Sequence, residues 1–117
     1  MSIKSKRILI IDDDEDHLKL IRLILETAGY HVAVSQGAED ALILAKKDPP
    51  HLIITDLRME PMSGFEFIEK YFQSSVAMKA PVLAFSSLKD KQSVYRAISL
   101  GARDYLVPSR LHPGRFY

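Results

Sequence analysis

The sequence contains no cysteine and no tryptophan among its 117 residues. The absence of cysteine excludes disulfide bonds and cysteine-ligated zinc sites, which stabilise many small domains. A chain of this length does not depend on them, because it can bury roughly two-thirds of the surface that its unfolded form exposes. We therefore expect a single globular domain over residues 1–117, with a core at about 6–107 and an irregular tail over 108–117.

The sequence also lacks a surplus of charge of one sign and any long hydrophobic run. Its 16 basic and 15 acidic side chains give a formal net charge of +1, so the composition offers no support for direct nucleic-acid binding. The apolar run after Arg7 is limited to Ile8–Ile11 and stops at a run of acids, which argues against an export signal or a transmembrane span. We expect a cytoplasmic domain that makes no membrane contact.

What the sequence does contain is a regular alternation of two patterns. Short apolar runs rich in β-branched residues are typical of strands covered on both faces. They occur at Ile8–Ile11, Val32–Val34, Leu52–Ile54, Val82–Phe85 and Tyr105–Val107. Four segments with helical period lie between them, and their apolar stripes start at Leu18, Ala38, Phe65 and Val94. The alternation predicts an α/β fold with a five-stranded parallel sheet and right-handed crossovers. We expect the sheet to be doubly wound with strand order 2-1-3-4-5, a common order for such sheets.

The alternation stops after Val107. The segment over 108–117 contains Pro108, Pro113 and Gly114, which do not favour a full helix. We therefore expect the fifth helix to be shortened or absent. One face of the sheet would then keep apolar side chains exposed, and a second copy of the chain, forming a homodimer, is one candidate to cover them.

Polar residues directly follow the predicted strands at three places. Asp12 and Asp13 follow the first strand, Asp56 comes shortly after the third, and Ser86 follows the fourth. In a doubly wound sheet, ligands bind outside the carboxyl ends of the strands, so the order 2-1-3-4-5 would bring these side chains together. Neighbouring carboxylates repel one another unless they share a cation, and oxygen ligands of this kind suit Mg²⁺.

A simpler role explains the acids that follow Asp12 and Asp13 in the sequence. Asp14, Glu15 and Asp16 are best interpreted as the acidic first turn of a helix, where negative charge is favourable. Asp56 has no such explanation, because no helix begins directly after it. Asp56 is therefore the most informative acid in the chain.

Other known site patterns fit less well. A calcium-binding loop would need glycine where His17 stands. A phosphatase of the haloacid dehalogenase type would need threonine or valine at position 16, where the chain has aspartate, and it remains a distant alternative. The glycines form no phosphate-binding loop. The histidines lack metal-ligand spacing, and we expect all of them at the surface or at strand edges: His17, His31, His51 and His112.

Taken together, several segments resemble the receiver domain of two-component response regulators. The matching segments are Ile8–Asp16, Leu52–Met59, Phe85–Ser87 and Gly101–Leu106. A further mark is the spacing of Gly64, which lies eight residues after Asp56. The resemblance covers about residues 6–107, which is nearly the whole chain.

The resemblance implies that Asp56 accepts a phosphoryl group. It further implies that Asp12 and Asp13 hold Mg²⁺ together with the Asp56 carboxylate and the backbone carbonyl of Arg58. The phosphoryl donor would be a histidine kinase or a histidine phosphotransfer protein, and the signal would pass to an output protein or domain. The chain would then be a signalling phosphoacceptor and not a turnover enzyme, catalysing only its own phosphorylation and dephosphorylation.

The resemblance also implies a switch, and here the chain departs from the family. Ser86 matches the hydroxyl residue that hydrogen-bonds the phosphoryl group, and Tyr105 matches the aromatic residue that changes rotamer with it. Pro108 stands where the family has a lysine, and Glu60 stands where it usually has a proline, with Pro61 next. The missing lysine keeps an alternative open: a pseudo-receiver that binds proteins without being phosphorylated.

Overall fold

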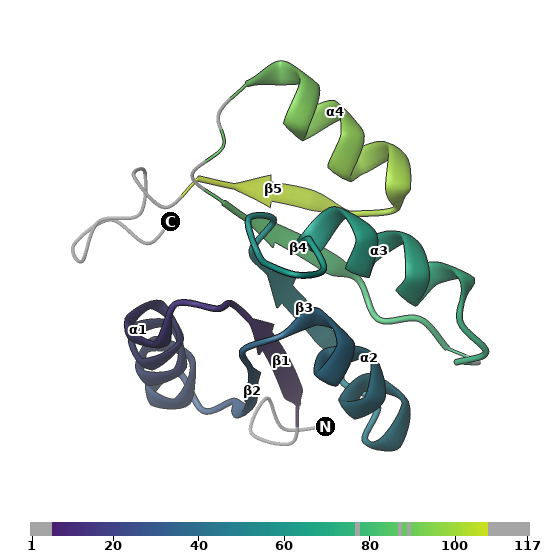
Figure 1. Ribbon diagram of the computed structural model, residues 1–117. Helices are drawn as coiled ribbons and strands as arrows, with labels where there is room; N and C mark the ends of the chain where they lie inside the picture. Colours follow the sequence, from purple (N-terminus) through teal and green to yellow (C-terminus); the bar gives the residue numbers. More distant parts are fainter. Residues whose placement is uncertain (1–5, 77, 87, 89, 108–117) are drawn as a thin grey trace.

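The computed structural model describes residues 6–76, 78–86, 88 and 90–107, and over these ranges it has a five-stranded sheet and four helices (Figure 1). In chain order the elements are β1 (Arg7–Ile11), α1 (Glu15–Thr27), β2 (His31–Ser35), α2 (Ala38–Lys47), β3 (Leu52–Thr55), α3 (Gly64–Gln73), β4 (Val82–Phe85), α4 (Lys91–Leu100) and β5 (Asp104–Leu106). The strand order is β2-β1-β3-β4-β5, and every neighbouring pair is parallel.

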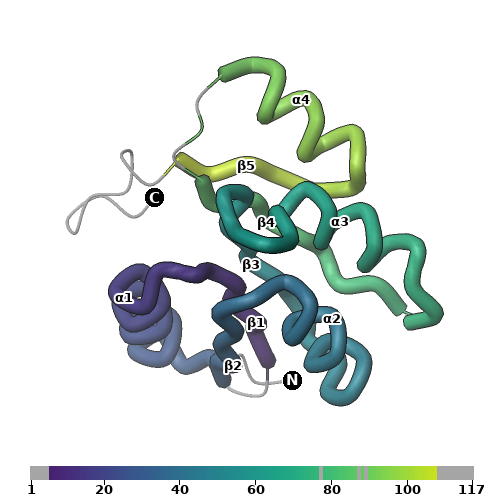
Figure 2. Tube along the Cα trace, in the orientation of Figure 1, coloured from purple at the N-terminus to yellow at the C-terminus, as the bar shows by residue number. Residues whose placement is uncertain are grey.

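The helices are divided between the two faces of the sheet. α1 packs against β1 and β2 on one face, whereas α2, α3 and α4 lie side by side along the other (Figure 1). Each helix carries the chain back to the end of the sheet where the next strand begins (Figure 2). All five strands therefore finish at the same edge of the sheet, which is where a ligand site is expected in this architecture.

The side chains of β1 supply both layers of the core. Leu9 and Ile11 point into the layer formed with α2, α3 and α4, whereas Ile8 and Ile10 pack with Leu18 of α1. All of these side chains are buried, which explains why the strand has no polar residue at alternate positions.

Local signals in the sequence set the helix ends. The carboxylate of Asp14 accepts the N–H groups of Asp16 at 2.9 Å and His17 at 3.3 Å, so Asp14 is the N-cap of α1. Asp90 caps α4 in the same way, and Gly101 ends that helix at φ 127°, a conformation that favours glycine. The acids at positions 14–16 thus serve the helix start, as the sequence predicts.

The predicted fold class and strand order are confirmed. The last strand is displaced by one residue from its predicted range, because its pairing with β4 places Asp104 opposite Leu83 and Leu106 opposite Phe85. Within the described residues, none of the helices combines the length and apolar character of a membrane-spanning segment. Pro108 and the expected loss of a fifth helix lie outside these residues, so they and the expected homodimer stay predictions.

Candidate functional site

The candidate site lies at the edge of the sheet where the strands end. Asp12 and Asp13 follow β1, Asp56 follows β3, and Ser86 follows β4. Main-chain hydrogen bonds continue the sheet beyond the strand ends: the N–H of Asp12 donates to β2 at 3.1 Å, that of Asp56 to β1 at 2.8 Å, and that of Ser86 to β5 at 3.0 Å. The sheet itself therefore fixes the backbone of these residues.

The structure brings together the three carboxylates that the sequence analysis singled out. Asp12, Asp13 and Asp56 each offer an oxygen within 4.8 Å of the other two. Asp12 is buried, Asp56 is half-buried and Asp13 is exposed, so the cluster opens to solvent on one side. A cavity of about 710 Å³ lies elsewhere, between α1, β2 and α2, and none of the three carboxylates lines it.

Asp12 is the innermost member of the cluster, with a relative exposure of 2%. Its Oδ1 accepts the N–H of Asp14 at 2.9 Å, and its Oδ2 lies 3.2 Å from Nδ1 of His17. Burial raises the pKa of the Asp12 carboxyl, and the lowering effects of the Asp14 N–H and of His17 do not cancel this rise. The negative charge on Asp12 is thus unfavourable in its surroundings.

Asp56 is held by the loop that follows β3. Its Oδ1 accepts the N–H of Leu57 at 2.8 Å and that of Arg58 at 3.4 Å. Burial is the main cause that raises the pKa of the Asp56 carboxyl, and repulsion from Asp12 adds to it. The two N–H groups and the Ser86 hydroxyl lower this pKa without restoring its ordinary value. Asp56 therefore combines a fixed orientation with an unfavourable charge.

The same loop returns to the site at Gly64, the first residue of α3. The N–H of Gly64 donates to the carbonyl of Leu57 at 3.1 Å. A Cβ at position 64 would overlap the carbonyl oxygen of Asp56 and would lie 2.7 Å from the Cα of Leu57. Glycine is required here by close packing of backbone on backbone, which gives a physical reason for its spacing from Asp56. The Glu60–Pro61 peptide bond in this loop is cis.

Ser86 and Tyr105 are connected through the main chain of Leu88. The Ser86 Oγ accepts the N–H of Leu88 at 3.3 Å, and the carbonyl of Leu88 accepts the Tyr105 hydroxyl at 2.7 Å. Ser86 is 1% exposed, whereas Tyr105 is half-buried, and burial raises the pKa of its phenol. Two hydrogen bonds, both made by the main chain of Leu88, thus join Ser86 to Tyr105.

Little positive charge offsets the acidic cluster in the part of the chain that the structure describes. The ion pairs found there do not include Asp13 or Asp56, and the Arg58 side chain is exposed. The basic group in contact with the cluster is His17, at 3.2 Å from Asp12. We expected His17 at the surface, and that expectation missed this contact. The position of His17 in the first helical turn places it near the acids but does not specify this contact.

The donor set of the site fits a hard divalent cation. Mg²⁺ prefers oxygen ligands and is commonly bound by one or two carboxylates together with water. The three carboxylates present such oxygens at the open edge of the sheet. The pKa values of Asp12 and Asp56 are both raised, so a shared cation would remove an existing unfavourable interaction.

Comparison with known proteins identifies the family. The sequence matches the response regulator receiver domain over residues 8–109. The chain belongs to this family. The two-component response regulator ORR24 of Oryza sativa subsp. japonica is 37% identical over 108 residues, covering 90% of this chain and 17% of that protein.

Solved receiver structures share the fold. The chemotaxis protein CheY4 of Vibrio cholerae has a TM-score of 0.85 at 27% identity, covering 92% of this chain and 89% of that one. A response regulator protein from Burkholderia pseudomallei, solved with a phosphorylated aspartic acid, a calcium ion and citrate, has a TM-score of 0.83 at 26% identity, covering 92% of this chain and 62% of that one.

Membership in the family makes this chain a signalling domain of two-component systems and not a classical enzyme. Receiver domains generally bind Mg²⁺ at their acidic pocket, and response regulators receive phosphate from histidine kinases and act on output domains. The chain spans 17% of the length of the rice regulator.

Proposed function

We propose that this receiver domain, as one unit over residues 1–117, is a cytoplasmic phosphoacceptor. It takes a phosphoryl group onto Asp56 from a histidine kinase or a histidine phosphotransfer protein and relays the signal to an output partner. The observation that carries the proposal is the placement of Asp56. Its carboxylate lies within 4.8 Å of those of Asp12 and Asp13, and two main-chain N–H groups hold its Oδ1.

Asp56 supplies the nucleophile for phosphoryl transfer. The main-chain donors of the described residues bond to Oδ1, so we assign the attack on phosphorus to Oδ2. As the bond from Oδ2 to phosphorus forms, the bond from phosphorus to the imidazole nitrogen of the donor breaks, and that nitrogen keeps the electron pair. The N–H groups of Leu57 and Arg58 keep the carboxylate oriented for this attack.

We assign a Mg²⁺ site to Asp12, Asp13, the Asp56 carboxylate and the backbone carbonyl of Arg58. When bound, the ion would neutralise charge on the oxygens of the transferring group. Asp12 suits this role because hydrogen bonds fix both of its carboxylate oxygens, and Asp13 lies at the exposed rim, next to solvent. The phosphorylated aspartic acid and calcium ion of the Burkholderia protein support this assignment by analogy.

We assign phosphoryl binding to Ser86 and the conformational response to Tyr105. The hydroxyl of Ser86 would donate to a phosphoryl oxygen on Asp56, which draws Ser86 toward the site. Because Leu88 bonds to both Ser86 and Tyr105, this movement changes the contact that holds the tyrosine hydroxyl. The surface around Tyr105 is then the place where an output partner would detect phosphorylation.

Mass spectrometry of the intact chain after incubation with acetyl phosphate and Mg²⁺ tests the proposal. We expect one phosphoryl group on the wild type and none on Asp56→Asn. The matched control is Glu69→Gln, which removes a negative charge from the exposed side of α3 and should be phosphorylated like the wild type. If the wild type binds Mg²⁺ but acquires no phosphoryl group from acetyl phosphate or from a phosphorylated phosphotransfer protein, the result contradicts the proposal and favours the pseudo-receiver.

A further inference from the structure

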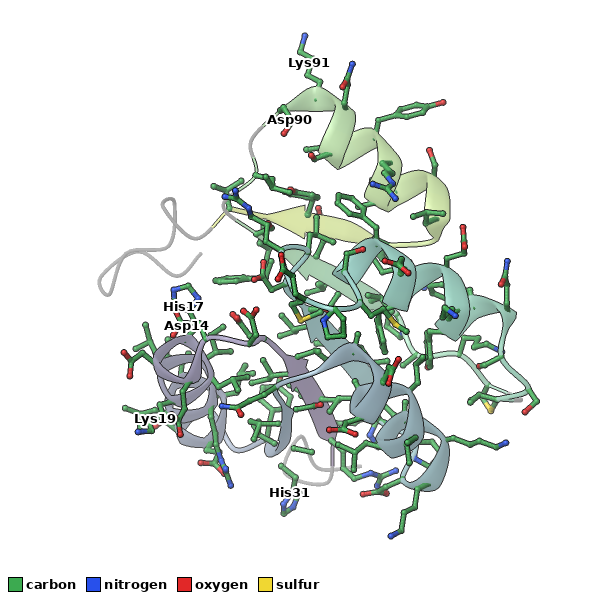
Figure 3. The ribbon with its side chains drawn as sticks, in the orientation of Figure 1. Asp14, His17, Lys19, His31, Asp90 and Lys91 are labelled. Carbon is green, nitrogen blue, oxygen red and sulfur yellow. The ribbon has the colours of Figure 1, made fainter. Side chains whose placement is uncertain are left out.

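His17 lies in the first turn of α1, directly beside the acidic cluster. Its Nδ1 is 3.2 Å from Oδ2 of Asp12, and its Nε2 is 3.8 Å from Oδ2 of Asp14. Figure 3 shows His17 and Asp14 together at the N-terminal end of α1. The side chain of His17 is 52% exposed, so solvent and dissolved ions can reach its ring.

The separation of the two donor atoms matches that of two ligands on one metal ion. Two ligands at about 2.0 Å from a tetrahedral cation lie about 3.3 Å apart. The observed distance between Nδ1 of His17 and Oδ2 of Asp12 is 3.2 Å. A cation can therefore bind both atoms without separating them or drawing them together.

The chemistry of this pair differs from that of the three carboxylates. Imidazole nitrogen suits zinc, nickel, cobalt and copper, whereas Mg²⁺ prefers oxygen and keeps much of its water. Metal-binding histidines commonly donate their second ring N–H to a carboxylate, and the carboxylate of Asp14 lies 3.8 Å from Nε2 of His17. Asp12 belongs both to this pair and to the carboxylate cluster.

We propose that His17 adds a nitrogen ligand to the acidic site, so that Co²⁺ and similar transition-metal ions bind through Nδ1 of His17 and the Asp12 carboxylate and compete with Mg²⁺. This inference rests on the proposed function for the Mg²⁺ site, which supplies the competing ion. In the metal-bound form Nδ1 carries no proton, and the ring proton is on Nε2, directed to Asp14. Mg²⁺ binds without His17 among its ligands, so the histidine determines which metal ions the site prefers.

Titration calorimetry with Co²⁺ and with Mg²⁺ on the full chain tests this inference. We expect His17→Gln to weaken Co²⁺ binding by about tenfold or more, and to change Mg²⁺ binding by less than about twofold. Glutamine retains a side-chain N–H that can reach Asp12, so the fold and the acidic cluster are preserved. The matched control is His31→Gln, since His31 is exposed at the start of β2 and lies at the bottom of Figure 3, away from His17 at the left. This control should bind both ions like the wild type.

A spectroscopic measurement separates a ligand from a residue that only positions Asp12. In the Co²⁺-loaded wild type we expect a paramagnetically shifted proton resonance from the Nε2–H of His17, which disappears in D₂O and is absent from His17→Gln. The inference is overturned if His17→Gln binds Co²⁺ as tightly as the wild type, or if it weakens both ions equally. In either case the Mg²⁺ site of the proposed function stands. If Co²⁺ binds through His17 but Mg²⁺ does not bind at all, His17 is a metal ligand, but the inferred competition with Mg²⁺ and the proposed Mg²⁺ site are both refuted.

Discussion

Replacing Asp56 by asparagine should stabilise the metal-free protein, although it removes the proposed phosphoacceptor. Asp12 and Asp56 have carboxylate oxygens within 4.8 Å of each other, and repulsion from Asp12 contributes to the raised pKa of the Asp56 carboxyl. Two unit charges at 4.8 Å repel by about 3.5 kcal/mol at an effective dielectric constant of about 20, and by about 0.9 kcal/mol in bulk water. Asparagine keeps an Oδ1 that can accept the N–H groups of Leu57 and Arg58, so the loop retains its hydrogen bonds.

We therefore expect Asp56→Asn to raise the free energy of unfolding by about 1–3 kcal/mol in EDTA at neutral pH. An unfolding entropy of about 2.1 cal/mol/K per residue over 117 residues makes 1 kcal/mol equivalent to about 4 °C, so Tm should rise by about 4–12 °C. Mg²⁺ at a hundredfold above its Kd should stabilise the wild type by about 2.7 kcal/mol, and the variant by much less.

Thermal unfolding followed by circular dichroism, in EDTA and in Mg²⁺, measures both effects. Glu69→Gln is the control for loss of one negative charge, and it should leave Tm and the Mg²⁺ response unchanged. The reasoning fails if Asp56→Asn lowers Tm in EDTA, because the cluster would then not be repulsive. It also fails if the variant gains as much Tm from Mg²⁺ as the wild type does.

Three further predictions follow from the same site. Burial and repulsion raise the pKa of Asp12 and Asp56 in the folded state above their values in the unfolded chain, so protonation of these carboxyls favours folding. The stability advantage of Asp56→Asn in urea unfolding should therefore shrink as the pH falls from neutral toward these raised pKa values. Gly64→Ala should cost about 1–3 kcal/mol in the same assay, since its Cβ would overlap the Asp56 carbonyl. Because Pro108 stands where the family has a lysine, beryllofluoride, a mimic of the phosphoryl group on Asp56, should shift the amide resonances around Tyr105 only weakly. Large shifts of these resonances would show that the conformational switch does not need the lysine.

The fold could be predicted from the sequence because its signals are local and repeated. In β1 an unbroken apolar run requires cover on both faces, and the structure provides it through Leu9 and Ile11 on one side and Ile8 and Ile10 on the other. The alternation alone does not determine the strand order; the expected order 2-1-3-4-5 is one that brings together the polar residues after β1, β3 and β4, and the structure has this order. The end of β5 was displaced by one residue, since pairing with β4 and not local pattern sets its range.

The placement of the three carboxylates could also be predicted, because each lies next to the end of a strand and the sheet brings those ends together. The contact of His17 with Asp12 could not. It depends on the direction in which α1 leaves the sheet after its Asp14 cap, and on the rotamer of a half-exposed ring. Residue spacing places His17 close to the acids, but it does not specify which ring atom faces them.

The connection between Ser86 and Tyr105 could not be predicted from the sequence, for a different reason. It uses the N–H and the carbonyl of Leu88, groups that every residue except proline supplies together. The identity of the side chain at position 88 therefore carries no information about this role. Motifs reveal side chains that do chemistry, whereas the link between the proposed acceptor site and the tyrosine is made by the main chain of Leu88. A substitution of the Leu88 side chain can leave this connection intact, while a change that moves the main chain of Leu88 breaks it.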